Sequence, residues 1–408
     1  MHVEVRWRSW HGDEPLTLDF PDPYRVTVYP PRDAPDIGAE GIRRTFAAPI
    51  GTARIAELAR GKRRAVIVVD DIARPTPASR VVPAILEELG EAGVPCRGIT
   101  FLLALGCHRA MTRAEMVRKL GEEAVRAYRV LNHYAYENLV HVGTTSRGTP
   151  VALNRHYVEA EVRIGVGQIS PHGGPGWSGG AKIVLPGVAG VETIVANHKP
   201  GRLRLGLARI EGNEWRADME EAVRLAGIDA IVNVVVNSSR GIAGLFVGDL
   251  VAAHRAGVAR AWEVMSTPLP PEPADIGVFN QYPKDTEFMH LTHALHVVSS
   301  APRPLVRPGG TMVILSASSD GFGYHTLESP GMRHASAGVL PVFEGHRPVV
   351  MCPTINASEL PPSLPPTTRL VPDWKGVLGA LAEDHPQGGS VAVFPCGAIQ
   401  VAERAAVN

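Results

Sequence analysis

The segment AVIVVDDIARP, residues 65–75, decides the fold that this sequence predicts. Its first five residues are apolar and mostly β-branched, which is typical of a strand buried on both faces of a parallel sheet. An amphipathic helix is expected from about Ser79 to Ala92, and the apolar run from Ile99 to Leu105 predicts the next strand. Strand, helix and strand form a βαβ unit, so we predict an α/β fold with a mainly parallel sheet.

The rest of the chain repeats this alternation in two blocks. Apolar runs at Val162–Val166 and Ala230–Val236 predict further buried strands in the first block. Residues 267–273, TPLPPEP, are rich in proline, as interdomain linkers often are. We therefore predict two α/β domains with mainly parallel sheets, residues 1–266 and 274–408, joined by this linker. The active site is expected in the interdomain cleft.

Composition excludes several classes of partner. In the 408 residues, 41 Lys and Arg balance 41 Asp and Glu, so nothing indicates binding to nucleic acid or to an anionic membrane. The four cysteines are scattered, which argues against a disulfide framework or a thiolate zinc site. The polar N-terminus and the lack of an apolar run of about 18 residues predict a cytoplasmic protein.

Polar residues suited to chemistry follow three of the predicted strands. Asp71 and Arg74 come after the first strand, His108 after the second and His172 after the third. Because open parallel sheets bind ligands at the carboxyl ends of their strands, we expect these residues to lie close together. The alternative is purely structural: Asp71 could cap the helix that follows it, and Arg74 could pair with Asp71.

The glycine-rich segment 168–198 holds three side chains that can ligate or attack: His172, Lys182 and His198. Lys182 could form a covalent bond to a carbonyl of a cofactor or substrate, and His198 could ligate a metal. His108 and His172 are suited to proton transfer at the two faces of one carbon. A solvated lysine and packing histidines are the alternative interpretation.

A similar strand-to-loop junction is predicted in the second domain. Gln281 and Lys284 follow a strand expected at Ile276–Phe279. The ammonium group of Lys284 and the guanidinium group of Arg74 would together suit a carboxylate or a phosphate.

Five motifs in this order resemble the lactate racemase family of nickel-dependent 2-hydroxyacid racemases and epimerases: DDIARP (70–75), GCHRAMT (106–112), HGGPGWSGGAK (172–182), GVAGVETIVANH (187–198) and NQYPKD (280–285). The resemblance implies a nickel-pincer nucleotide, a pyridinium-3,5-bisthiocarboxylic acid mononucleotide that holds nickel. It also implies that Lys182 binds this cofactor covalently, that His198 completes the nickel coordination, and that Asp71 belongs to the cofactor-binding residues.

The resemblance further implies the reaction. The chain would invert C2 of a small 2-hydroxy acid by proton-coupled hydride transfer to the tethered nucleotide, with His108 and His172 as the catalytic acid/base pair. Arg74, Gln281 and Lys284 would bind the substrate. In lactate-specific members an aromatic residue of the second domain packs near the substrate. Phe343 and Tyr324 are the candidates for that role, and the particular acid stays open.

Two other functions are compatible with the same residues. One is a metal-dependent lyase or dehydratase of hydroxy acids that uses the histidines without a tethered nucleotide. The other is a non-catalytic carrier of the nickel cofactor. In the racemase interpretation, the expected partners are the substrate and the cofactor-biosynthesis proteins that load the enzyme, whereas the oligomeric state is left open.

Overall fold

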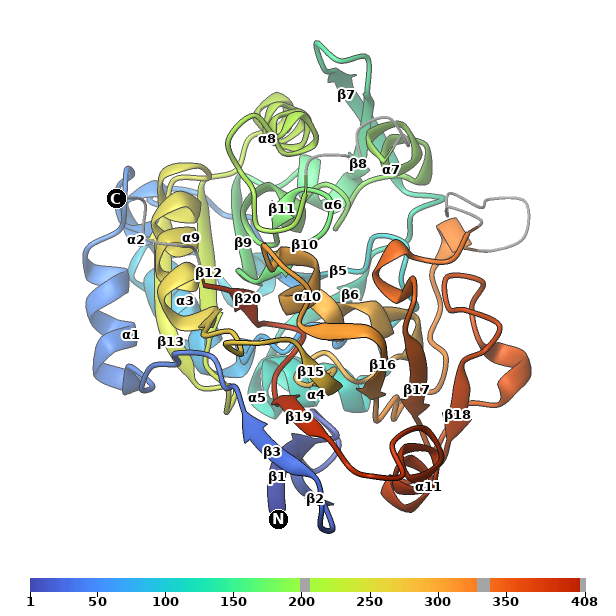
Figure 1. Cartoon of the computed structure of the whole chain (residues 1–408). Coiled ribbons are helices and arrows are strands. Elements are labelled where there is room, and N and C mark those ends of the chain that lie inside the picture. The colour runs from blue at the N-terminus through green and yellow to red at the C-terminus, as the bar shows by residue number, and fades with distance from the viewer. Residues whose placement is uncertain (199–205, 329–337, 404–408) are drawn as a thin grey trace. The chain divides into compact units, whose positions relative to one another are not determined.

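The chain folds into two compact units, and each contains a mainly parallel sheet. The computed structural model describes residues 1–198, 206–328 and 338–403. Unit 1 comprises residues 1–33, 262–323 and 335–408, and unit 2 comprises residues 34–261 and 324–334. The predicted α/β class is confirmed (Figure 1). A site between the units stays a prediction.

Unit 2 is built on a six-stranded sheet of order β13-β12-β9-β4-β5-β6. Its strands are β4 (Ala65–Asp70), β5 (Ile99–Ala104), β6 (Arg129–Asn132), β9 (Val162–Gln168), β12 (Ala230–Val236) and β13 (Ile242–Gly248). Neighbouring strands run parallel except β12 and β13, which are antiparallel. All six residues of β4 are buried, as expected for a central strand with both faces covered.

The helices of unit 2 follow the expected alternation, with one error. They are α1 (Gly38–Ala47), α2 (Ile55–Leu58), α3 (Ala78–Glu91), η1 (Cys96–Gly98), α4 (Arg113–Leu120), α5 (Glu122–Ala127), α6 (Arg155–Val158), η2 (Gly180–Ile183), α7 (Val191–Asn197), α8 (Glu214–Ala226) and η5 (Thr326–Glu328); α9 (Ala252–Met265) begins in this unit. Thr112 and Glu115 have the sequence pattern of a capping box, which predicts a helix from Thr112 to about Leu131. The helix instead breaks at Gly121, whose φ is +91°, and the short helix α5 and then β6, which pairs with β5, follow.

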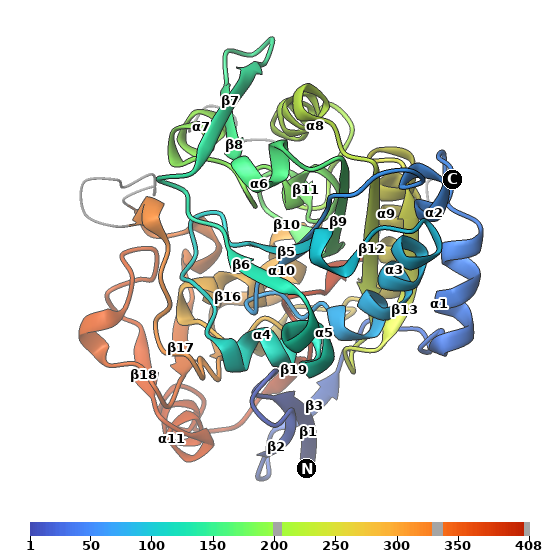
Figure 2. The same cartoon turned by 180° about the vertical axis from the view of Figure 1, so that it is seen from behind.

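Short antiparallel ribbons complete unit 2. Strands β7 (Leu139–Thr144) and β8 (Pro150–Asn154) form a hairpin that projects at the top of Figure 1, and Figure 2 shows it from behind. Strands β10 (Pro171–His172) and β11 (Gly176–Trp177) pair directly after β9.

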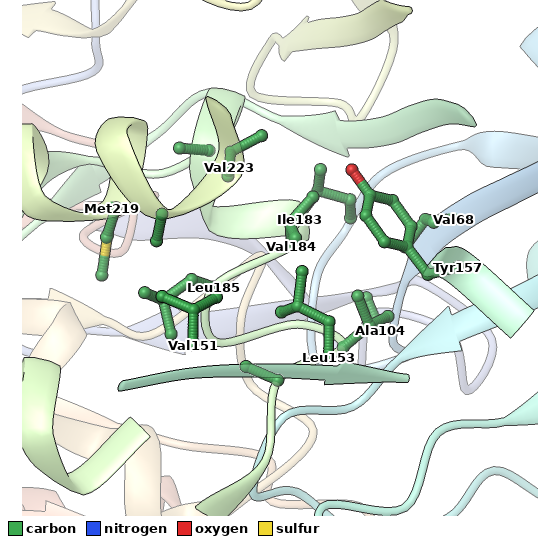
Figure 3. Close-up of a cluster of buried hydrophobic side chains, with 14 of the residues drawn as sticks. Val68, Ala104, Val151, Leu153, Tyr157, Ile183, Val184, Leu185, Met219 and Val223 are labelled. Carbon is green, nitrogen blue, oxygen red and sulfur yellow. The ribbon is translucent and has the colours of Figure 1, made fainter. Parts of the chain in front are cut away.

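The core of unit 2 supports the glycine-rich segment. Ile183, Val184 and Leu185 are at most 4% exposed and belong to one apolar cluster. Figure 3 shows these three side chains with Val151 and Leu153 of β8. Burying such side chains contributes roughly 1.5–3 kcal/mol each. The turn that carries Lys182 is therefore anchored by the apolar residues that follow it.

Unit 1 contains a second six-stranded sheet, of order β18-β17-β16-β15-β19-β3, in which all neighbours are parallel. Its strands are β3 (Arg25–Val28), β15 (Ala274–Asn280), β16 (Val306–Leu315), β17 (Arg347–Met351), β18 (Arg369–Val371) and β19 (Ser390–Phe394). The hairpin β1 (His2–Trp7) and β2 (Glu14–Asp19) precedes β3. The helices are η4 (Phe288–Leu295), α10 (His296–Ser300), η6 (Pro341–Phe343), η7 (Ala357–Glu359) and α11 (Trp374–Asp384).

The unit boundaries differ from those expected for the two domains. Because β3 pairs with β19, residues 1–33 fold with unit 1 and not with residues 34–261. The proline-rich segment 267–273 lies inside unit 1. There β14 (Ser266–Thr267) pairs with β20 (Val401–Ala402), and the chain then enters β15. The change in composition at residue 267 indicates a domain boundary, but in the structure unit 1 resumes a few residues earlier, at Trp262.

Among the residues that the structure describes, no helix has the length and apolar character needed to span a bilayer.

Candidate functional site

The carboxyl ends of three adjacent strands build one cavity in unit 2. Strands β9, β4 and β5 are neighbours in the sheet, and the loops after them meet at the same edge. Its lining includes six side chains that can bind a ligand or transfer a proton: Asp71, Arg74, His108, Lys182, His198 and His325. Five of them are sequence-predicted site residues, and His325 is not.

His108 is oriented by Asp71. The Nδ1 atom of His108 lies 2.6 Å from Oδ2 of Asp71, while Oδ1 accepts a hydrogen bond from the Ala73 backbone N–H at 3.0 Å. Burial alone would raise the pKa of the Asp71 carboxyl, but the hydrogen-bonded His108 and nearby cations outweigh burial and hold that pKa well below its usual range. A carboxylate that accepts from Nδ1–H leaves Nε2 as the basic nitrogen of the ring. The pair is thus arranged for proton transfer at Nε2 of His108.

A buried lysine, absent from the sequence-based candidates, holds the loop after β4. The Lys119 side chain is 0% exposed, and its Nζ lies 2.8 Å from Oδ1 of Asp70. It also donates to the backbone oxygens of Asp71 and Arg74, each at 2.8 Å. Burial lowers the pKa of Lys119 and raises that of Asp70, and their mutual attraction opposes both shifts. Lys119 therefore fixes the loop that presents Asp71 and Arg74.

Lys182 is hydrogen-bonded to His172. Its Nζ lies 3.0 Å from Nε2 of His172, and the Gly174 backbone N–H donates to Nδ1 of the same ring at 3.2 Å. A neutral imidazole that accepts at Nδ1 carries its proton on Nε2. That ring nitrogen faces the side-chain nitrogen of Lys182. The uncharged amine is the nucleophilic form of lysine.

The backbone before Lys182 is held rigidly rather than as a mobile glycine loop. Gly179 and Gly180 have φ of +74° and +56°, conformations that favour glycine. Arg216 of α8 is buried, and it donates to the carbonyl of Gly179 at 3.0 Å and to the carbonyl of Trp177. The ring of buried His254 lies 2.9 Å from the carbonyl oxygen of Ser178. The sequence does not indicate that Arg216 or His254 supports this turn, because both residues lie in ordinary helical patterns.

His198 lies at the end of α7 with its ring orientation fixed. Its Nδ1 lies 2.9 Å from the Ile194 carbonyl, and its ring packs edge-on against Trp215 with centroids 4.7 Å apart. A carbonyl can only accept, so Nδ1 carries the proton and Nε2 presents a lone pair. This is the arrangement by which histidines ligate metals in proteins.

Two polar groups in the cavity lack hydrogen-bond partners among the described residues. One is the buried Nη1 of Arg74, and the other is Oε1 of Gln168, whose side chain is 2% exposed. Leaving a buried polar group unpaired costs about 1–3 kcal/mol, more for a charged group. A ligand that brings an oxygen to Arg74 relieves that cost. Gln168 begins the segment 168–198 but carries no sequence signal of its own.

His325 reaches the cavity from a distant part of the chain. Its ring centroid lies 5.2 Å from that of His108. Burial and the positive charge of neighbouring side chains lower the pKa of His325 to about 2, so its ring is uncharged. No motif precedes it in the sequence.

Gln281 and Lys284 lie in unit 1, in the loop after β15, and are buried. The Gln281 amide donates to the carbonyls of Lys284 at 2.7 Å and Glu287 at 3.1 Å, and its oxygen accepts from Ser316. Gln281 thus holds this loop in shape. The contribution of Gln281 and Lys284 to substrate binding stays a prediction.

No group of three or more His, Cys, Asp or Glu side chains suited to hold a metal ion occurs within residues 1–198, 206–328 and 338–403.

Comparison with known proteins identifies the family. A family model described as the lactate racemase N-terminal domain matches residues 11–204. The lactate racemase of Lactiplantibacillus plantarum is 33% identical over 297 residues, which are 71% of this chain and 69% of that protein. The chain belongs to the lactate racemase family. The lactate racemase of Thermoanaerobacterium thermosaccharolyticum is 32% identical over 289 residues, 69% of this chain and 66% of that protein. As a member of the lactate racemase family, this chain is an enzyme of the isomerase class.

Solved structures agree with this membership. The lactate racemase apoprotein from Thermoanaerobacterium thermosaccharolyticum superposes with a TM-score of 0.77 and 25% identity, covering 99% of this chain and 100% of that chain. A protein from Thermotoga maritima has a TM-score of 0.67 at 17% identity, covering 89% and 98%, and supports the fold alone.

Proposed function

We propose that this lactate racemase family member inverts C2 of a small 2-hydroxy acid and that it uses a lysine-tethered nickel-pincer nucleotide. The observation that carries the proposal is one cavity that presents a lysine amine, a ligand-ready histidine, a carboxylate-oriented histidine and an arginine N–H without a protein partner among the described residues. When bound, the nucleotide supplies an acceptor for the hydrogen that leaves C2 with its electron pair.

The residues present fit this group. The Lys182 amine, which lies 3.0 Å from His172 Nε2, would hold the nucleotide covalently. The lone pair of His198 Nε2 is suited to nickel, and the remaining ligands would come from the nucleotide itself. Asp71 belongs to the same wall, although its carboxylate oxygens are engaged by His108 and Ala73. We therefore infer that Asp71 acts on the site through His108.

The substrate would be held and deprotonated by residues of this cavity. Arg74 would bind the carboxylate through its Nη1, in keeping with the preference of guanidinium groups for carboxylates. His108 Nε2 would take the proton of the C2 hydroxyl, while Asp71 keeps the ring in the required tautomer. His172 would return or take a proton for the opposite enantiomer. We propose Gln281 and Lys284 as further substrate-binding residues.

The test uses the chain loaded with nickel and the nucleotide by the cofactor-biosynthesis proteins, its proposed cytoplasmic partners. Each enantiomer of a set of 2-hydroxy acids is incubated in deuterated water, and the product is analysed on a chiral column. We expect inversion of at least one acid, and intact mass should show a nucleotide-sized adduct on Lys182.

Other outcomes would favour the rival functions. An adduct without inversion of any acid favours a cofactor carrier. Loss of water from the acids without an adduct favours a metal-dependent lyase or dehydratase.

A further inference from the structure

His325 is fixed in the cavity by contacts that do not involve its ring. Its backbone forms an isolated bridge with His108, and the Thr326 N–H donates to the carbonyl of Cys107 at 2.9 Å. The next residue, Leu327, is 2% exposed and packs in the apolar core of unit 2. The ring is therefore presented to the cavity by an anchored segment.

The protonation of the ring follows from its one hydrogen bond within the described part of the chain. The Leu327 backbone N–H donates to Nδ1 of His325 at 3.2 Å. Since Nδ1 accepts, the uncharged ring carries its proton on Nε2. Nε2–H is then a neutral donor on a ring that lines the cavity. Such a donor is satisfied when a ligand brings an oxygen to it.

The neighbours of His325 leave one substituent of the substrate to be recognised. If the proposed function holds, the C2 hydroxyl faces His108 and the carboxylate faces Arg74. The remaining carbon substituent of C2 is C3 with the groups it carries. The ring centroid of His325 is 5.2 Å from that of His108, which is within reach of a group attached next to C2.

We propose that His325 Nε2–H donates a hydrogen bond to an oxygen on C3 of the substrate. This inference rests on the proposed function and deepens it. It assigns the enzyme to 2-hydroxy acids with a hydroxyl or carboxyl substituent on C3. When C3 is a methyl group, as in lactate, the Nε2–H of His325 would be left without an acceptor in a partly buried wall of the cavity.

The experiment compares two acids on the loaded enzyme: D-glycerate, which has a hydroxyl on C3, and D-lactate, which has a methyl group. His325→Phe keeps an aromatic ring beside His108 but removes the donor. We expect it to lower kcat/KM for glycerate about 10-fold, mainly through KM, and to change that for lactate less than about 3-fold. His325→Gln, which returns an N–H near the place of Nε2, should recover part of the loss.

Equilibrium titration of the same two acids separates this inference from the proposed function. If the wild-type protein inverts none of the set of 2-hydroxy acids, the proposed function fails, and tighter binding of glycerate that is lost in His325→Phe still supports the inference. Equal losses for both acids, or a wild-type enzyme that binds lactate as tightly as glycerate, would overturn it. The control is His141→Phe at an exposed position of β7, which should change kcat/KM for neither acid.

Discussion

The buried Lys119–Asp70 pair offers the sharpest test of how unit 2 holds its site. In Lys119→Met, the side-chain volume is nearly kept, but Asp70 loses a partner 2.8 Å away and two carbonyls lose their donor. Removing one member of a buried ion pair costs about 3–5 kcal/mol. We expect the free energy of unfolding to fall by this amount at pH 7. The lost hydrogen bonds to the two carbonyls should not add to it, because Asp70 can become protonated and so avoid an unpaired buried charge.

The effect should depend on pH with a defined sign. Burial raises the pKa of Asp70 in the folded protein, and Lys119→Met removes the cation that opposes this shift. A carboxyl whose folded pKa is raised contributes stability below its unfolded pKa and loses it as pH rises through the folded pKa. The variant should therefore come closest to the wild type at acidic pH and diverge from it as pH increases.

Amide hydrogen exchange of β4, residues 65–70, is the assay, since this strand is buried at the centre of the sheet. A loss of about 3–5 kcal/mol corresponds to exchange that is roughly 10²- to 10⁴-fold faster. Arg113→Met, on the exposed face of the same helix, is the control and should stay within about 0.5 kcal/mol of the wild type. Adding Asp70→Asn to Lys119→Met should recover about 1–2 kcal/mol. Exchange in Lys119→Met within 5-fold of the wild type, on the order of 1 kcal/mol, would refute the reasoning.

Four further predictions concern the proposed chemistry. Lys182→Ala should abolish the covalent adduct in intact mass while leaving the circular dichroism unchanged, and a retained adduct would remove Lys182 from the tether. His198→Ala should lower the nickel content of the loaded protein after dialysis; unaltered metal stoichiometry would assign His198 a structural role. His108→Ala and His172→Ala should each slow interconversion of the enantiomers by at least about 10²-fold. In acid-quenched samples, one variant should have formed 2-keto acid from one enantiomer and the other variant from the opposite enantiomer. Formation from the same enantiomer in both variants would contradict the two-histidine assignment. The pKa of Asp71 is lower in the folded than in the unfolded protein, so the ionised carboxylate stabilises the fold above the unfolded pKa of about 3.9, and this stability is lost as pH falls through the folded pKa. Asp71→Asn should therefore be less stable than the wild type at pH 7, and its urea midpoint should vary less with pH below about pH 4 than that of the wild type.

The arrangement of β4, β5 and β9 could be predicted because it depends on local pattern. Continuous β-branched runs identify strands buried on both faces, and parallel strands place their carboxyl ends at one edge. The loops after these strands then bring Asp71, Arg74 and His108 to one cavity, as the structure shows. The hydrophobic pattern alone was therefore enough to predict that these three residues lie close together.

What could not be predicted depends on contacts between residues far apart in the chain. Residues 1–33 alternate polar and apolar positions as many edge strands do, and nothing local shows that β3 pairs with β19 rather than with its neighbours in sequence. Lys119 has the helical spacing of a surface lysine, yet its ammonium group neutralises a buried carboxylate. Arg216 likewise lies on a helix whose pattern does not show that the arginine binds the carbonyls of a glycine turn.

His325 shows why a site can be recognised by its motifs and still be incomplete. The five motifs end at Asp285, and each lies next to a predicted strand or helix that explains its position. His325 instead enters unit 2 because Leu327 is buried in that unit's core and Thr326 bonds to the loop of His108. A residue placed in this way is not subject to the constraints that the proposed cofactor and proton transfers would impose on the motifs. Because the proposed chemistry uses the motifs and not this donor, we infer that a substitution of His325 changes which 2-hydroxy acid is accepted.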